Sequence, residues 1–468
     1  MFNDFFSTTT AGTKIIVTST TETQWKSQLT QQQQEWLAQQ PSPKNGAYVL
    51  LPHSNGGIDK VIIYINSKED FWHMAALANS LPSGEYMLNP TSETIPAELL
   101  CIAWGLGFYK FDKYKSTAGE DETADAAKLV WPQGVSHTET LAWLDSIAMV
   151  RDLISTPACD MGPEELADSA KQLSKQHKAK FDITIGKALL KKNFPAIHTV
   201  GKAAADEPRL ATIHWQASEP KLKLALVGKG VCFDTGGLDL KPSGAMLLMK
   251  KDMGGAANVM GLANMIMAMQ LPVDLRVYLP IVENAISEQA MRPLDICHTR
   301  KGITVEIGNT DAEGRLILSD ALTLACEEKP DLVIDMATLT GAARVAMGTE
   351  VPALFTNNDE IAQKIQALSF ECVDPVWQLP LYKGYRRQLQ SSVADISSTG
   401  SIPLGGAITA ALFLNEFVDN SIDWVHVDMM AYNKTSRAGR PEGGEAASIR
   451  AIYCYIKEVV KNVNSNKE

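Results

Sequence analysis

The second half of the chain alternates between short apolar segments and longer amphipathic ones. Apolar segments of strand length lie at 222–233, 275–282, 303–307, 332–337 and 424–430. Segments with helical periodicity lie at 255–269, 312–328 and 407–418. Strands that are apolar on both faces and alternate with helices are typical of a mostly parallel sheet covered by helices. The pattern therefore predicts an α/β domain in this half.

The first part of the chain has shorter apolar runs separated by polar stretches. Residues 47–51 and 61–65 are predicted strands, and residues 71–80 are a predicted helix. A glutamine-rich run lies in a predicted polar helix whose buried side carries Trp36 and Leu37. These elements indicate a smaller α/β unit.

A charged stretch and a predicted helix separate the two parts of the chain. The stretch at 110–125 is charged and contains glycine, so it is expected to run over the surface. Periodic apolar residues over 139–155 then predict a connecting helix. We therefore expect an N-terminal domain over 1–150 and a second domain over 151–468.

Composition and charge narrow the class of protein. The chain has 468 residues, which is enough for two or three domains, and 45% of them are apolar. The net charge is −11 without a basic block, so nucleic acid is not expected as a main partner. Neither a secretory signal nor an apolar run of about 18 residues is present, so no membrane segment is expected. Seven dispersed cysteines without CxxC spacing indicate reduced thiols and a cytoplasmic protein.

Polar residues gather where the predicted strands end. Four carboxylates fall at such ends or at the starts of the following helices, accompanied by three basic residues. In open parallel sheets the carboxyl ends of strands form the active-site edge, so these side chains are expected to converge. The set consists of Asp234, Asp252, Asp311, Glu313, Lys229, Lys241 and Arg315.

Clustered carboxylates raise one another's pKa unless cations neutralise them. Lys241 and Arg315 can offset part of the charge, and a divalent metal can offset the rest. Oxygen ligands without a nearby histidine suit Mg²⁺, Mn²⁺ or Zn²⁺. Asp311 and Glu313, two residues apart on an extended segment, can present both carboxylates to one centre. The residues alone therefore indicate a metal-dependent α/β hydrolase.

Structural interpretations also exist for each of these residues. Asp252 can cap the helix that follows it, and Asp234 can belong to an ordinary turn. Lys229, inside an apolar strand, can form a buried salt bridge with a neighbouring carboxylate. Arg315 can lie on a solvated helix face.

One octapeptide links this pattern to a known family. NTDAEGRL at 309–316 matches the signature of the leucyl aminopeptidase (cytosol aminopeptidase) family. The chain resembles this family strongly over about 150–450 and loosely before that. Further matching segments are VGKGVCFDTGG at 227–237, LDLKP at 238–242, MKKDMGGAA at 249–257, ATLTGA at 337–342 and GGAITAALFLNEFV at 405–418.

The resemblance implies a role for each matched residue. One metal would be held by Lys229, Asp234, Asp252 and Glu313, and a second by Asp234, Asp311 and Glu313. Lys241 and Arg315 would be the catalytic residues that are not ligands, Arg315 by holding a bicarbonate. Met249, Thr338, Leu339 and Gly341 would line the substrate cleft, Met249 in the pocket for the first side chain.

The same resemblance implies the reaction and the assembly. Two ions, Zn²⁺ or Mn²⁺, would bind the free amino group of a peptide and activate a water for attack on the first peptide bond. The expected N-terminal domain resembles a macro-type fold, and the expected assembly is a homohexamer in the cytoplasm. A two-metal phosphatase and a DNA-binding regulator are the alternative functions.

The pocket for the first side chain depends on a segment that departs from the family pattern. Residues 441–446 read PEGGEA, where Gly443 and Gly444 leave open volume. Glu445 either brings a carboxylate to the pocket wall, which would favour lysine or arginine, or points to solvent or caps the final helix. We expect an apolar pocket that prefers leucine and methionine, with weaker activity on acidic residues.

Overall fold

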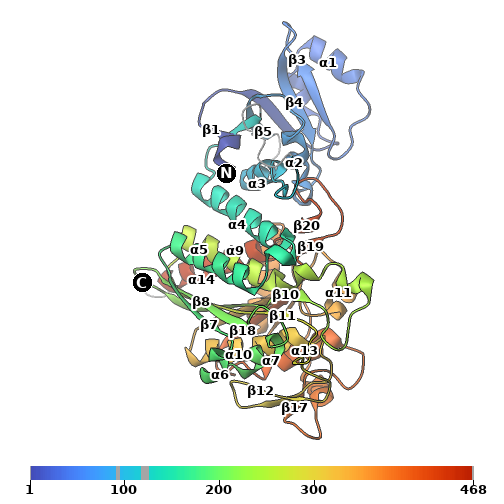
Figure 1. The fold of residues 1–468 in the computed structure, drawn as a ribbon. Helices are drawn as coiled ribbons and strands as arrows, with labels where there is room; N and C mark the ends of the chain where they lie inside the picture. The colour runs from blue at the N-terminus through green and yellow to red at the C-terminus, as the bar shows by residue number, and fades with distance from the viewer. Residues whose placement is uncertain (1, 91–94, 117–125, 466–468) are drawn as a thin grey trace. The chain divides into compact units, whose positions relative to one another are not determined.

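The chain forms two compact units in the computed structural model, which describes residues 2–90, 95–116 and 126–465. The first unit comprises Met1–Ala148 and Lys434–Glu442, and the second comprises Met149–Asn433 and Gly443–Glu468. Each unit combines a sheet with helices (Figure 1). No helix in the described ranges is long and apolar enough to cross a membrane.

The first unit is built on a six-stranded sheet with the order β1-β6-β5-β2-β4-β3. The strands predicted at 47–51 and 61–65 are confirmed as β3 and β4, and the helix predicted at 71–80 is the shorter α2. The predicted surface segment at 110–125 is largely exposed over 110–116, and its remainder lies outside the described residues. The bounds are β1 Phe6–Ser7, β2 Thr13–Thr18, β3 Tyr48–Pro52, β4 Ile58–Tyr64, β5 Gly84–Pro90, β6 Ala127–Val130, α1 Gln31–Ala38, α2 His73–Ala78, α3 Ala97–Gly107 and α4 His137–Ser155, which continues into the second unit.

The predicted burial on the glutamine-rich helix α1 is confirmed for Leu37, which packs against core residues of the first unit, and is wrong for Trp36. Trp36 is 44% exposed, and its indole nitrogen donates to the carbonyl oxygen of Leu50 at 3.2 Å. Gln33 is buried in its place. Its side chain closes a capping box with Thr30 and donates to Asp59 at 2.7 Å, so hydrogen bonds compensate for its burial.

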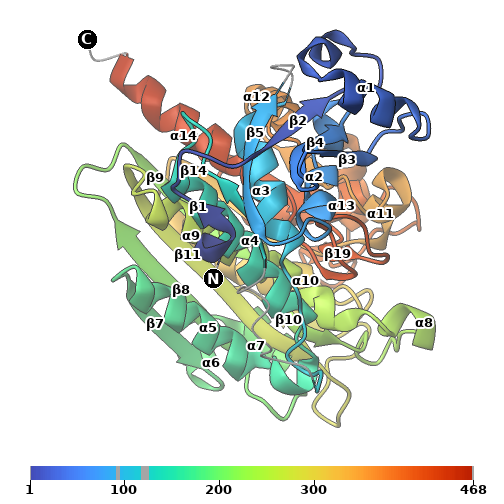
Figure 2. The ribbon, with the colours of Figure 1, turned by 90° about the horizontal axis from the view of Figure 1, so that it is seen from above.

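The second unit contains a nine-stranded sheet with the order β16-β15-β18-β14-β9-β11-β8-β7 and with β10 paired to β11. Strands β18, β14, β9 and β11 run parallel. Strands β8 and β7 continue the sheet antiparallel beyond β11 to an edge (Figure 2). The bounds are β7 Lys180–Ile185, β8 Arg209–Gln216, β9 Leu222–Gly228, β10 Gly230–Asp234, β11 Val273–Asn284, β14 Leu332–Ala337, β15 Ala353–Thr356, β16 Trp377–Gln378 and β18 Asp423–Asp428.

Helices cover both faces of this sheet, as the apolar strands predict. Figure 1 shows α5, α9 and α14 on one face and α7, α10 and α13 on the other. The helices predicted at 255–269, 312–328 and 407–418 are confirmed as α9, α10 and α13. The bounds are α5 Pro163–Gln176, α6 Ala188–Lys191, α7 Pro195–Gly201, α8 Ser243–Met246, α9 Gly254–Ala268, α10 Glu313–Glu327, α11 Gly341–Met347, α12 Asp359–Glu371, α13 Gly406–Asn415 and α14 Ile449–Ser465.

Two strand predictions need correction. The segment 303–307 forms β13 (Thr304–Glu306) in a separate three-stranded sheet with β12 (Ile296–His298) and β17 (Ile396–Ser397). The segment 222–233 is not one strand, because it is interrupted at Lys229 between β9 and β10.

The interruption at Lys229 has a cause in the neighbouring strand β11. Val227 pairs with Tyr278 and Gly230 pairs with Ile281, so in this shared register Lys229 falls opposite Pro280. A proline has no N–H to donate to a ladder. The Lys229 N–H donates to the carbonyl oxygen of Met336 on β14 at 3.1 Å, and the Lys229 carbonyl oxygen accepts from the Ala256 N–H at 2.8 Å. Lys229 is thereby fixed at the edge where the carboxylates lie.

Candidate metal centre

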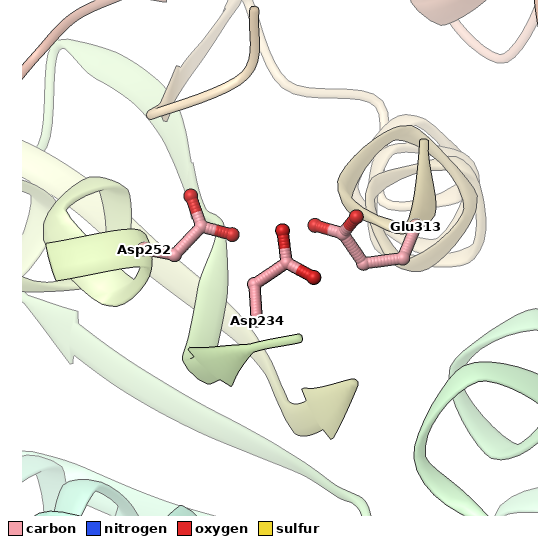
Figure 3. A group of neighbouring side chains, drawn as sticks. All are labelled: Asp234, Asp252 and Glu313. Atoms are coloured by element: carbon pink, nitrogen blue, oxygen red, sulfur yellow. The ribbon is translucent and has the colours of Figure 1, made fainter. Parts of the chain in front are cut away.

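Three buried carboxylates meet at the carboxyl end of β10. Asp234 is the last residue of that strand, Asp252 lies in the 3₁₀ helix Met249–Met253, and Glu313 is the first residue of α10. One oxygen atom from each of the three lies within 4.8 Å of the others (Figure 3). Their exposed fractions are 2%, 2% and 1%. Three elements that are distant in sequence thus place acidic groups around one point.

Lys229 joins two of these carboxylates. Its ammonium lies 2.6 Å from Asp252 Oδ2 and 2.9 Å from Glu313 Oε1, and it also donates to the carbonyl oxygen of Thr338 at 3.3 Å. Burial lowers the pKa of Lys229, but the charges of the neighbouring carboxylates outweigh it, and the pKa lies well above its ordinary value. The buried salt bridge expected for this lysine is therefore present.

Lys241 connects the cluster to Asp311. Its ammonium lies 2.8 Å from Asp234 Oδ2 and donates to Asp311 Oδ1. Burial lowers the pKa of Lys241, while its contacts with these two carboxylates raise it further than burial lowers it. Burial raises the pKa of Asp311 to about 6, and the charge of Asp234 adds to this effect. Asp311 therefore lies beside the three-carboxylate cluster.

The four carboxylates Asp234, Asp252, Asp311 and Glu313 outnumber the two lysines, Lys229 and Lys241, that contact them. Burial, together with the charge of Asp234, raises the pKa of Glu313 to about 8, although Lys229 opposes the shift. Glu313 Oε2 is enclosed and accepts no hydrogen bond from the described residues. A buried carboxylate oxygen without a donor, next to other oxygen ligands, fits a hard or borderline divalent cation. The residues present therefore suit a metal ion.

The structure also tests the structural interpretations of the acidic residues. Asp252 does not cap α9, because Met253 occupies the cap position. Its oxygens instead accept from Lys229 and, at 2.8 Å, from Thr338 Oγ1. Asp234 does belong to a turn, since its Oδ1 accepts from the Gly236 N–H at 2.8 Å. That turn leaves Oδ2 facing Lys241 and the cluster.

Arg315 is buried on α10, so the interpretation as a solvated helix face is wrong. Its Nη1 donates to the carbonyl oxygen of Ser398 at 2.6 Å, and its guanidinium carbon lies 5.9 Å from the centre of the Phe413 ring. Its Nε is enclosed, with no hydrogen-bond partner in the described ranges. Burial lowers the pKa of Arg315 to about 10. The guanidinium therefore has one N–H that no described residue accepts.

Two of the residues expected to line a substrate cleft, Met249 and Thr338, are tied to Asp252 of the acidic cluster. Met249 begins the 3₁₀ helix that carries Asp252, and Thr338 is hydrogen-bonded to Asp252. The Leu339 N–H donates to Asp428 Oδ1 at 2.9 Å, so this donor is already engaged. Gly341 is the first residue of α11.

Three residues near the site escaped the sequence reasoning. Asn284 donates to Asp234 Oδ1 at 2.8 Å, Asp428 holds the loop before α11, and Lys251 is buried next to Asp252. Asn284 and Asp428 are the last residues of β11 and β18, so the rule that polar strand ends form the site could have identified both. Burial lowers the pKa of Lys251 to about 8, while the charge of Asp252 opposes the shift.

Glu445 neither reaches solvent nor caps the final helix. Glu445 is 5% exposed, and Arg151 donates hydrogen bonds to both of its carboxylate oxygens, from Nε at 3.0 Å and from Nη2 at 3.3 Å. The cap of α14 comes from Asp374, which accepts from the N–H groups of Ser448 and Arg450 at 3.0 and 2.8 Å. The charge of Glu445 is thus neutralised inside the fold.

A mostly parallel sheet covered by helices, with buried carboxylates at the carboxyl end of a strand, is the architecture of an α/β metallohydrolase. Comparison with known proteins specifies the class. The family model for the catalytic domain of the cytosol aminopeptidase family matches residues 148–453, and the model for the N-terminal domain of M17 aminopeptidases matches residues 16–132. The chain belongs to the cytosol aminopeptidase family and is a metallo-exopeptidase.

Individual relatives support the assignment of the chain to this family. A probable cytosol aminopeptidase of Rhodococcus jostii is 36% identical over 401 residues, which cover 83% of this chain and 79% of the relative. The crystal structure of a cytosol aminopeptidase from Coxiella burnetii has a TM-score of 0.90 and 42% identity, over 97% of this chain and 98% of the other. The bottromycin maturation enzyme BotP in complex with Mn has a TM-score of 0.83 and 31% identity, over 96% of this chain and 100% of the other.

Proposed function

We propose that this chain removes the N-terminal residue from peptides by a two-metal mechanism centred on the acidic cluster. The observation that carries the proposal is the meeting of Asp234, Asp252 and Glu313 within 4.8 Å, all buried, with the enclosed Glu313 Oε2 lacking a donor among the described residues. Such an arrangement is unfavourable without additional positive charge. Divalent cations supply that charge.

The ligand sets follow the family pattern. One ion is held by Lys229, Asp234, Asp252 and Glu313, and the second by Asp234, Asp311 and Glu313. Lys229 binds through a neutral amine, a form that a nearby cation favours by lowering the pKa. We propose Zn²⁺ or Mn²⁺, and the Mn complex of the structural relative BotP supports the latter. When bound, such a pair polarises the scissile carbonyl and lowers the pKa of a water.

The two basic residues that are not ligands have separate tasks. Lys241 presents a preformed positive charge to the carbonyl oxygen on which negative charge develops. Its contacts with Asp234 and Asp311 hold the ammonium at the site beforehand. Arg315 would hold a bicarbonate, which would supply a proton acceptor at the site, and its buried guanidinium, whose Nε has no hydrogen-bond partner among the described residues, supports this role.

We propose that the substrate is bound by Met249, Thr338, Leu339 and Gly341, with Met249 against the first side chain. Because Arg151 neutralises Glu445, that carboxylate does not attract a basic side chain. An apolar wall favours leucine and methionine, since each buried methylene contributes about 0.8 kcal/mol. We also propose a cytoplasmic homohexamer on the basis of the family resemblance, and light scattering of the purified enzyme tests the hexamer.

Metal removal and reconstitution test the function. The chain is stripped with a chelator, Mn²⁺, Zn²⁺ or Co²⁺ is added back, and a panel of amino-acid amides is assayed. We expect no activity without metal, recovery with at least one ion, and leucine and methionine among the good substrates. Hydrolysis of a chromogenic phosphate ester with no activity on any amide would support a phosphatase instead. A salt-dependent shift of DNA in a gel would support the regulatory alternative.

A further inference from the structure

Two consecutive lysines before Asp252 have different environments. The ammonium of Lys250 donates to the carbonyl oxygen of Ser155 at 2.5 Å, at the end of α4. Lys251 is 1% exposed, yet its ammonium forms no hydrogen bond with any described residue. Its closest carboxylate oxygen is Asp252 Oδ1, at 4.0 Å. A buried ammonium without a hydrogen-bonded partner is unfavourable, so the surroundings of Lys251 favour an anionic group.

The acidic residues near Lys251 are already occupied. Asp252 Oδ2 accepts from Lys229 at 2.6 Å, and Oδ1 accepts from Thr338 at 2.8 Å. Asp428 accepts from the N–H groups of Leu339 and Thr340 and from the Thr340 hydroxyl at 2.6 Å. Both carboxylates therefore already accept hydrogen bonds from other donors, and Lys251 reaches Asp252 Oδ1 only at 4.0 Å.

A second unmatched cation lies nearby on α11. The charge of Arg344 repels that of Lys251, and Arg344 Nη1 is enclosed without a hydrogen-bond partner in the described part of the chain. Arg344 Nη2 lies 3.7 Å from the position that a Cβ on Gly341 would take, so the guanidinium folds back over the start of α11. Two elements thus each carry a cationic group with one nitrogen that lacks a hydrogen bond to any described residue, and the two groups are close enough for their charges to repel each other.

We propose that Lys251 and Arg344 form a subsite for the carboxylate of an acidic N-terminal side chain, so that peptides beginning with glutamate or aspartate join leucine and methionine peptides as substrates. This inference rests on the proposed function. Lys251 lies on the same 3₁₀ helix as Met249, placed at the first side chain, and Asp252, placed as a ligand beside the substrate's amino group. Its aliphatic stem can line the apolar pocket while its ammonium binds the carboxylate.

The test compares fluorogenic amides of glutamate, glutamine and leucine, which have no C-terminal carboxylate, in metal-loaded enzyme. We expect the wild type to prefer glutamate over glutamine, two side chains of nearly equal shape. Lys251→Met should lower kcat/KM for the glutamate amide by about 30-fold, the scale of a lost charged hydrogen bond, and change the leucine value by less than about 3-fold. Arg344→Met should act in the same direction, and Lys251→Arg should retain glutamate activity.

Lys250→Met is the matched control, since it removes the same charge from the adjacent residue and should leave the glutamate-to-leucine ratio unchanged. A wild type that cleaves the leucine but not the glutamate amide overturns the inference and leaves the proposed function intact. Failure on every amide overturns the proposed function. Loss of bound metal and of both activities in Lys251→Met would show that Lys251 only positions Asp252. An effect of Lys251→Met on a leucine dipeptide but not on the amides would assign the anion to the peptide's C-terminus.

Discussion

A Cβ atom added to Gly314 would lie 2.3 Å from Cε and 2.9 Å from Nζ of Lys229. The Lys229 side chain therefore packs directly against the backbone of Gly314, the glycine of the octapeptide. Gly314 directly follows Glu313, whose carboxylate contacts the same ammonium. The lysine can reach Glu313 because the next residue has no side chain.

Gly314→Ala should therefore displace Lys229 and lower both activity and metal content. The contact distance lies far below van der Waals contact, and the obstructed group is the part of the lysine that meets the carboxylates. We expect kcat/KM to fall by about 10² or more if the Lys229 ligand is lost. Metal analysis and kinetics of the purified variant check this. Gly244→Ala is the control, because a Cβ there meets no atom within 4 Å. Full activity in Gly314→Ala would contradict the proposed role of Lys229.

Much of the second unit follows from apolar periodicity. The run at 332–337 becomes β14 with every residue buried, and the amphipathic segments become α9 and α10. Asp234 was found because polar residues that follow an apolar strand mark the active-site edge of a parallel sheet. Local patterns suffice for such features because each depends on neighbours in sequence.

Other features depend on partners far away in the chain. The interruption at Lys229 comes from Pro280 on the neighbouring strand, which no local pattern around Lys229 reveals. Glu445 lies in a polar, glycine-rich segment that suggests exposure, but Arg151, 294 residues earlier, makes its burial possible. The assignment of Lys229 as a ligand came from the family resemblance, since its spacing alone predicts only a salt bridge.

Glu313→Gln should lower metal content and remove nearly all activity. The substitution keeps the shape of the side chain but removes the charge that, in the proposed ligand sets, bridges both ions. Metal analysis by mass spectrometry and assays on leucine amide measure the two effects. Glu327→Gln, at the other end of α10, removes the same charge from an exposed pair with Arg300 and should change neither. A Glu313→Gln enzyme that keeps two ions per chain would exclude the bridging role.

Lys241→Met should keep the metal ions and slow turnover. The ammonium contacts Asp234 and Asp311 but is not in the proposed ligand sets. Loss of one group that stabilises developing negative charge typically lowers kcat by about 10². Steady-state kinetics give kcat and KM separately, and metal analysis gives the metal content of the variant. Lys241→Arg should recover part of kcat. Reduced metal binding with a lowered melting temperature would show that Lys241 is structural.

Glu445→Gln should lower stability without changing the choice between leucine and lysine substrates. Arg151 is fully buried and forms a two-point contact with Glu445, which also accepts from Asn433 at 2.5 Å. Removing one charge of such a buried pair typically costs about 3 kcal/mol, because the other charge stays in the interior. We therefore expect the melting temperature to fall by about 5 °C or more.

The control for this prediction is Glu416→Gln, which removes the same charge from a pair with the exposed Arg386 and should have little effect on melting. The kcat/KM values for leucine and lysine amides complete the test. Because the charge of Glu445 is matched by Arg151, the wild type should prefer leucine, and the variant should retain that preference. A wild-type preference for lysine that disappears in Glu445→Gln would mean that this carboxylate faces the substrate, and the buried pair with Arg151 would not describe the working enzyme.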